Sequence, residues 1–120
     1  FGIGAGSFTE IFFFNTNFWK GHSHNLLFEL SISYGLPATI IFLITTLNIL
    51  YLSSKKIFSS KIKIDLNYID RAFWSALFFF LISQLADVQY FDGKISLITW
   101  ILMAGLKNII LDKDYRIVAQ

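Results

Sequence analysis

The chain lacks several residue types on which soluble proteins depend. It contains no cysteine, which excludes disulfides and thiolate metal sites. It has a single proline, and 15% of its residues are charged, against about a quarter in a typical soluble domain. More than half of the residues are apolar, and fourteen of the 120 are Phe. This composition is typical of an integral membrane protein.

An initiator Met and a signal-peptide pattern are also missing, since the chain opens at Phe1. We therefore expect a C-terminal part of a longer polytopic protein. The net charge of +2 is small, and no nucleic-acid partner is expected.

Three apolar segments approach the length that spans a bilayer, which is roughly 20 residues for a helix and about 17 at the short end. They are residues 36–52, 72–86 and 95–111. The second is short unless its flanks help. The predicted fold class is all-α, a polytopic membrane fragment with three transmembrane helices, preceded by an outer-face loop and a short amphipathic helix.

The basic residues orient these segments. Eight of the ten Lys and Arg residues lie between the first two segments or late in and after the third, and only Lys20 and Lys94 lie elsewhere. Short loops rich in Lys and Arg stay in the cytoplasm. We therefore predict an outer-face region at residues 1–35, a three-span region at 36–111 and a cytoplasmic tail at 112–120.

The first 35 residues carry most of the polar chemistry. The alternating glycines of residues 2–6 follow no buried strand and precede no Lys-Ser/Thr pair, so we interpret them as a bend, not a phosphate loop. Apolar residues recur at helical spacing over 26–34, and either Ser23 or Asn25 can cap that helix. Gly35 ends it, and Pro37 suits the first turn of the next helix.

His22 and His24 are the two histidines of the chain, and imidazole has an unperturbed pKa of about 6.5, which suits proton transfer near neutral pH. The alternative is a solvated loop pair. No metal site is predicted, because zinc needs three or four protein ligands and the sequence shows no third His or Cys nearby. We expect Glu29 to face solvent instead of restraining His24, and Asp87 to lie in a hydrated loop.

A spacing pattern adds a family resemblance. His24 and Asn25, nine residues, then Gly35 and an apolar span resemble the signature of the O-antigen ligase and O-antigen polymerase superfamily of bacterial membrane proteins. The signature ends three residues after that glycine with Gly, Thr or Tyr, where this chain has Ala38. The glycine-rich start and the last apolar segment, which holds Trp100 and Gly105, are similar to the family as well.

The resemblance implies a glycosyltransferase of the cell envelope, acting in lipopolysaccharide biosynthesis at the outer face of the bacterial inner membrane. The donor would be a glycan on undecaprenyl pyrophosphate, and the acceptor lipid A–core, another glycan or a protein. Membrane lipid and the upstream helices of the parent chain would be further partners, and no cofactor is implied.

By the same resemblance, His24 would be the catalytic base that activates the acceptor. Asn25, His22 and Lys20 are the candidate substrate-binding residues, and Asn25 is equally suited to capping the helix. The pyrophosphate-binding arginines would come from upstream segments, so the fragment alone would be inactive. The alternative is a transporter, similar to the bicarbonate-transporter-like relatives. Transporters place ionisable groups near the bilayer midplane, and the predicted spans carry no His, Arg or carboxylate there.

Overall fold

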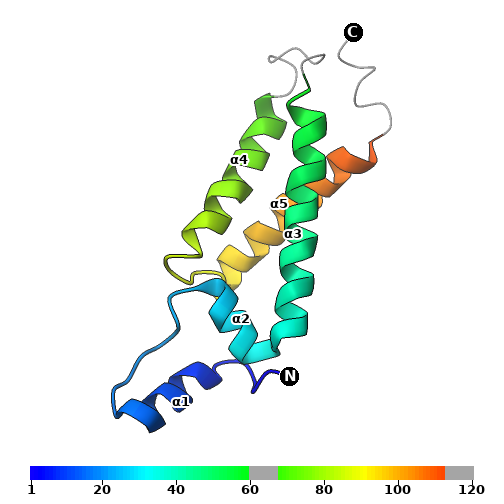
Figure 1. The fold of residues 1–120 in the computed structure, drawn as a ribbon. Coiled ribbons are helices and arrows are strands. Elements are labelled where there is room, and N and C mark those ends of the chain that lie inside the picture. The colour runs from blue at the N-terminus through cyan, green and yellow to red at the C-terminus, as the bar shows by residue number, and fades with distance from the viewer. Residues whose placement is uncertain (60–67, 113–120) are drawn as a thin grey trace.

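The computed structural model describes residues 1–59 and 68–112. Within these ranges the regular elements are all helices: α1 (Ser7–Thr16), α2 (Leu26–Tyr34), α3 (Leu36–Ile57), α4 (Tyr68–Ser83) and α5 (Gly93–Leu111). Helices α3, α4 and α5 pack on one another, and α5 crosses behind α3 (Figure 1). Helices α1 and α2 lie at the end that carries the N-terminus. The predicted all-α class is confirmed for the described residues.

The predicted apolar segments correspond to the three long helices, with shifted ends. Helix α3 starts at the expected residue and continues for five residues beyond residue 52. The extension includes Lys55 and Lys56, whose charges are favourable in the last turn of a helix. Helix α4 begins four residues before the predicted segment and ends three residues before its end. Helix α5 begins at Gly93, two residues early, because Asp92 caps it there by accepting from the amides of Lys94 and Ile95.

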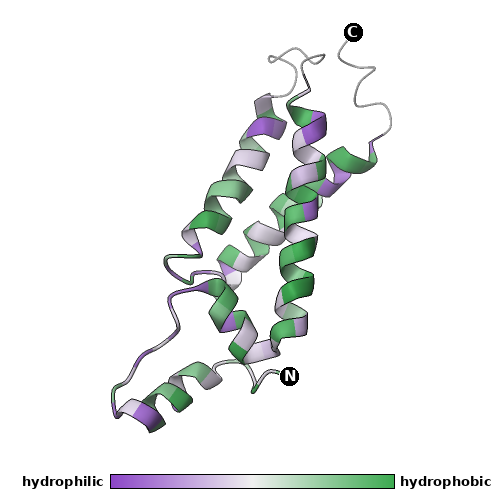
Figure 2. Cartoon of the chain, viewed as in Figure 1, coloured by the Kyte–Doolittle hydropathy of each residue, from purple (hydrophilic) through white to green (hydrophobic). Residues whose placement is uncertain are grey.

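Helices α3 and α5 are long and apolar enough to cross a membrane, by length and composition. Only 22% and 17% of their apolar windows, respectively, are buried inside the chain. The core helix of a soluble protein would be mostly covered, so this exposure favours membrane association. Helix α4 has 16 residues, about 24 Å at the usual rise, which is shorter than a hydrocarbon core of about 30 Å. Figure 2 shows hydrophobic residues along all three helices.

A small core holds these helices together. Leu77 of α4 and Leu106 of α5 are fully buried and pack with Leu50 of α3. The indole Nε1 of Trp74 donates to the carbonyl oxygen of Leu50 at 2.9 Å, which ties α4 to α3. Helix α5 approaches α4 closely at Gly105, where a Cβ would lie 3.1 Å from the ring of Phe73. Dispersion contacts of this kind are individually small but add up over a packed interface.

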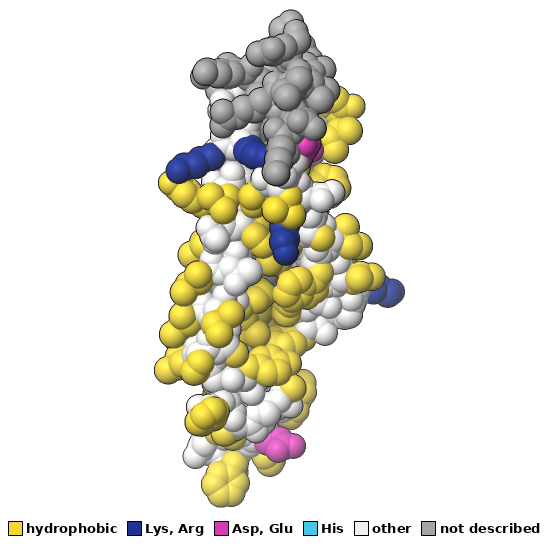
Figure 3. All heavy atoms as spheres, turned by 90° about the vertical axis from the view of Figure 1, so that its right-hand side faces the viewer, with side chains coloured by type: hydrophobic (Ala, Val, Ile, Leu, Met, Phe, Trp, Pro, Cys, Tyr) yellow, Lys and Arg dark blue, Asp and Glu magenta, His cyan; other side chains and the backbone are white. Residues whose placement is uncertain are grey.

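One end of the bundle holds the C-termini of α3 and α5 and the N-terminus of α4, and we call it the lysine end. Its described basic residues are Lys55, Lys56, Arg71 and Lys107. There the ammonium of Lys56 donates to the carbonyl oxygens of Ile109, Ile110 and Asp112 at 3.0, 2.8 and 2.6 Å. The first two are carbonyls of the last turn of α5, which have no partner within the helix, and the third belongs to its C-cap residue. Figure 3 shows most of the visible Lys and Arg side chains toward this end, with a further one protruding near the middle of the molecule. Lys56 thus closes α5 from the neighbouring helix.

The N-terminal region departs from the sequence prediction, because part of it is helical. Helix α1 was not predicted, because residues 11–14 form a continuous apolar run that favours no single face of a helix. It buries no residue and follows Gly6, which has a φ of 79°. Helix α2, by contrast, has the predicted bounds of 26–34.

The junction between α2 and α3 depends on Gly35. This residue has φ 91° and ψ 162°, a backbone region that only glycine occupies readily. The N-terminal segment also passes so close that a Cβ on Gly35 would lie 2.7 Å from the backbone nitrogen of Gly2. The segment is held by the amide of Ile3, which donates to the carbonyl oxygen of Ile32 at 2.9 Å. Conformation and space therefore both require glycine here. Of the predicted cytoplasmic tail, residues 113–120 lie outside the described residues.

Candidate functional site

Two loops meet at the other end of the bundle, which we call the histidine end: residues 21–25 before α2, and residues 84–92 between α4 and α5. Asn25 joins them. Its Oδ1 accepts from the amides of Leu27 and Phe28 at 3.0 and 3.3 Å, which caps α2. Its Nδ2 donates to the carbonyl oxygen of Leu85 at 3.0 Å. Of the two predicted capping residues, Asn25 is the one that accepts these bonds, and the same side chain holds the second loop.

Gln84 shapes the second loop from inside. Its side chain is fully buried, and its Oε1 accepts from the amides of Gln89 and Tyr90 at 2.8 and 2.9 Å. Its carbonyl oxygen accepts from the amide of Leu26 at 2.9 Å, a second link to α2. Buried backbone donors are costly to leave unpaired, and Gln84 pairs two of them. The two loops are therefore fixed relative to each other by the Leu26–Gln84 backbone hydrogen bond and by the side chain of Asn25.

The position of Glu29 differs from the one predicted from the sequence. We expected its carboxylate to face solvent, but only 5% of the residue is exposed. Its Oε2 accepts from the amide of Ser23 at 2.9 Å, because the histidine loop folds back over the first turn of α2 and its amide needs an acceptor. Glu29 thus restrains the residue before His24, which is close to the alternative that the sequence had left open.

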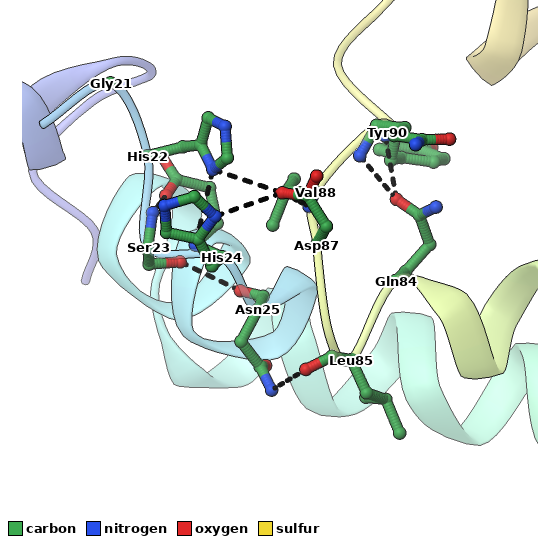
Figure 4. A network of polar contacts seen from close by, with 12 residues as sticks. Gly21, His22, Ser23, His24, Asn25, Gln84, Leu85, Asp87, Val88 and Tyr90 are labelled. Carbon is green, nitrogen blue, oxygen red and sulfur yellow. Dashed lines mark hydrogen bonds and ion pairs between the residues drawn. The ribbon is translucent and has the colours of Figure 1, made fainter.

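The two histidines face one carboxylate (Figure 4). His24 Nδ1 lies 3.1 Å from Asp87 Oδ1, and His22 Nδ1 lies 3.9 Å from the same oxygen. The two rings are 4.4 Å apart between centroids, in an edge-on arrangement. His24 has a φ of 57°, in the left-handed region that non-glycine residues seldom adopt. Such a conformation persists only where the surroundings impose it, as the two linked loops do here.

The contact with Asp87 defines which ring nitrogen of His24 carries the proton. An ionised carboxylate is only an acceptor, so the 3.1 Å contact requires the ring proton on Nδ1 and leaves Nε2 with a free lone pair when the ring is neutral. The hydrogen bond from His24, together with one from the amide of Val88, holds the pKa of Asp87 below its ordinary 3.8. The side chains of His24 and Asp87 are about half exposed, so solvent can reach them.

The predicted site residues are only partly brought together. His22, His24 and Asn25 lie at the contact between the two loops, whereas the ammonium of Lys20 lies over the ring of Phe12 in α1, 5.7 Å from its centroid. Sequence reasoning missed Asp87 as a partner and placed it in a hydrated loop. It lies 63 residues from His24, and no spacing rule links the two; the one available signal was a shared predicted location on the outer face.

The structure also supplies the third donor that the sequence lacked for a metal. One ligand atom from each of His22, His24 and Asp87 lies within 4.8 Å of the others. The absence of a third His or Cys was therefore not sufficient to exclude a metal site.

Comparison with known proteins assigns no family to the chain. The chain matches no protein-family model, no curated protein and no solved structure. What remains is the chemistry of the site: a half-exposed imidazole, oriented by a carboxylate, beside a group of apolar helices. Such an arrangement can remove a proton from a hydroxyl group.

Proposed function

We propose that the chain is the C-terminal part of a membrane glycan ligase or polymerase, which transfers a glycan from undecaprenyl pyrophosphate to a lipid or sugar acceptor. The observation that carries this proposal is the contact between His24 and Asp87 at the histidine end of the apolar helices. The His24-Asn25 and Gly35 pattern, which resembles the O-antigen ligase and polymerase superfamily, supports the same assignment.

In the proposed reaction His24 is the general base. An acceptor hydroxyl attacks the anomeric carbon of the donor sugar, and Nε2 of His24 takes the hydroxyl proton as the new glycosidic bond forms. The bond between the sugar and the pyrophosphate breaks, and undecaprenyl pyrophosphate leaves with the electron pair. Asp87 keeps the ring in the Nδ1–H tautomer and stabilises the imidazolium. General base catalysis of this kind is typically worth 10²–10⁴-fold in rate.

The leaving pyrophosphate needs positive charge, which arginine provides best. Among the described residues, Arg71 is the one arginine. It lies in the first turn of α4, at the opposite end of the bundle from the histidines, so it cannot serve this site. We propose that upstream helices of the parent chain bring the arginines, and that Lys20 contributes after turning away from Phe12. The fragment then holds one half of an active site.

The proposed topology has three spans in the bacterial inner membrane, with the histidine end in the periplasm and the lysine end in the cytoplasm. Helix α4 is shorter than the hydrocarbon core. Its flanking residues and the apolar surfaces of the neighbouring helices would fill the remaining thickness. An apolar cavity of about 210 Å³ lies among α2, α3 and α4, and Leu26 and Leu85 of its lining are next to Asn25 and Gln84. A cavity of this character is suited to the first isoprene units of the carrier.

Transport is the weaker alternative. In the described parts of α3, α4 and α5, the carboxylates, Lys and Arg lie in or near the terminal turns, as for Asp70, Lys94 and Lys107. A transported ion would be expected to meet such groups near the midplane. The imidazole–carboxylate pair lies at one end instead, which favours chemistry at the membrane surface.

The test is glycan transfer by the full-length parent in membranes, from a polyprenyl-pyrophosphate glycan to lipid acceptors, with wild-type and His24→Asn proteins. Asn tolerates the left-handed backbone of residue 24 but cannot act as a base, so the loop is kept. We expect a loss of about 10²-fold or more, partly restored by added imidazole. His24→Ala serves as a second variant, and equal expression and insertion are required. Undiminished transfer by both variants would remove His24 from the mechanism.

A further inference from the structure

The two histidines and Asp87 have a second possible use beyond proton transfer. Three donor atoms of the kinds that transition metals prefer, two imidazole nitrogens and one carboxylate oxygen, lie within 4.8 Å of one another. Both imidazole nitrogens, Nδ1 of His22 and Nδ1 of His24, approach the same oxygen, Asp87 Oδ1 (Figure 4). We propose that His22, His24 and Asp87 form a binding site for a divalent transition-metal ion of the Zn²⁺ class, with solvent in the fourth position.

The distances are close to those of an occupied site. Zinc lies about 2.0–2.2 Å from nitrogen and oxygen ligands, which places neighbouring ligand atoms of a tetrahedron about 3.3–3.6 Å apart. The separation between His24 Nδ1 and Asp87 Oδ1 is already 3.1 Å. The separation between His22 Nδ1 and the same oxygen is 3.9 Å, which a small rotation of the partly exposed His22 ring can shorten. Loading the site therefore requires side-chain movement and no change of backbone.

The backbone that carries the ligands is held without the ion. The Asn25–Leu85 and Leu26–Gln84 hydrogen bonds fix the two loops, at 3.0 and 2.9 Å. The left-handed backbone of His24 sets its ring beside that of His22, although the two residues are only two positions apart. Positioning of ligands before binding lowers the cost of forming a metal site.

Binding exchanges weak contacts for coordination. His22 Nδ1 now accepts from the amide of His24 at 3.3 Å, a long hydrogen bond that the metal would replace. On His24 the ion would take the place of the Nδ1 proton shared with Asp87, and the ring would keep one proton, now on Nε2, so that it stays neutral. An imidazole protonated at Nε2 cannot accept the proton of an acceptor hydroxyl. The next step rests on the proposed function. The ion inhibits glycan transfer, because it competes with the form of His24 that acts as a base.

The experiment measures metal binding first and transfer second. The full-length chain, purified in detergent with a histidine-free tag, is titrated with Zn²⁺ against a chromogenic chelator and with Co²⁺ by absorption spectroscopy. We expect one tight site with a tetrahedral Co²⁺ band. His22→Gln and Asp87→Asn should each weaken it by about 100-fold or more, since even outer-shell partners of a metal are worth 10–100-fold. Glu10→Gln is the matched control, because Glu10 is an exposed carboxylate of α1.

The outcomes separate the two proposals. Binding that both ligand variants lose and the control keeps supports the site, whether or not the protein transfers any glycan. Binding that is absent, or unchanged in His22→Gln and Asp87→Asn, overturns it. Where transfer is measurable, Zn²⁺ at the concentration that fills the site should abolish it. Full transfer by the zinc-loaded protein would overturn the competition between ion and base.

Discussion

The two ends of the helical bundle use their polar side chains differently. At the lysine end, the Lys56 ammonium donates to three backbone carbonyls, two in the last turn of α5 and one in its C-cap residue, so its charge closes a helix. At the histidine end, Asn25, Glu29 and Gln84 pair with the loop amides and carbonyls. The His24 ring and the Asp87 carboxylate remain about half exposed and face each other. A charge occupied by the backbone is structural, whereas an exposed, oriented acid–base pair is available for chemistry.

This difference separates supporting residues from candidate reacting ones. Buried polar groups that satisfy backbone partners contribute to stability, and their loss leaves unpaired groups. The exposed pair contributes little to stability, because solvent screens it. Substitutions at the two kinds of position should therefore affect different measurements.

After substitution of His24 itself, the largest expected effect on activity is that of Asp87→Asn. The amide retains the size of the side chain and can still accept from the amide of Val88, but it neither fixes the Nδ1–H tautomer nor stabilises an imidazolium. We expect transfer by the parent enzyme to fall about 10²-fold, in kcat with little change in donor KM, and thermal stability to stay the same. Asp92→Asn in the same loop is the control, because Asp92 caps α5 and Asn caps equally well. Equal losses in both variants would make Asp87 an ordinary loop residue.

Gly35→Ala should have the largest effect on stability. The added Cβ meets backbone atoms of the N-terminal segment below 3 Å, in a conformation that alanine disfavours. We expect a destabilisation of about 3 kcal/mol, measured by thermal unfolding in detergent through tryptophan fluorescence. Gly93→Ala is the control, since nothing lies within 4 Å of its Cβ position and no positive φ is required. If both variants unfold together, the α2–α3 junction does not depend on glycine.

Lys56→Met should have a smaller effect, on stability alone. It keeps the apolar stem and removes the three hydrogen bonds to the last turn of α5, with an expected cost of about 1–2 kcal/mol. Lys55→Met removes a neighbouring ammonium that lies 4.3 Å from the ring centroid of Tyr51, for about 0.5 kcal/mol. The same unfolding measurement compares the two. A larger loss for Lys55→Met would contradict the structural role assigned to Lys56.

The smallest effect concerns pH. Because the pKa of Asp87 is below 3.8 in the folded chain, chiefly through the His24 hydrogen bond, its contact with His24 stabilises the loops above pH 3.8. This contribution is lost as the pH falls through the lowered pKa. A carbon-13 NMR titration of the Asp87 carboxyl should show its midpoint rising toward 3.8 in His24→Asn. A midpoint that does not move would show that the His24 bond has no influence on the carboxyl.

Local features of the chain were predictable because their causes are local. The bounds of α2 followed from its helical spacing and from a capping Asn25 and a terminating Gly35. The ends of the long helices were less predictable, since Tyr68 extends α4 and Asp92 starts α5 earlier than hydropathy alone suggests. Helix α1 was missed because a run of aromatic residues has no periodicity from which a helix can be inferred.

By itself, the sequence determined the class of the protein, an apolar helical chain with its basic residues gathered at one end, and it pointed to His24. These properties depend on composition and on spacing within a few turns. Only the tertiary structure decided that Asp87 meets His24, that Glu29 is buried and that a third metal donor exists. The reason is that these contacts join loops 60 or more residues apart or depend on a backbone fold-back. The Asn25 side chain, which donates to the carbonyl of Leu85, and the backbone hydrogen bond from Leu26 to Gln84 set that geometry.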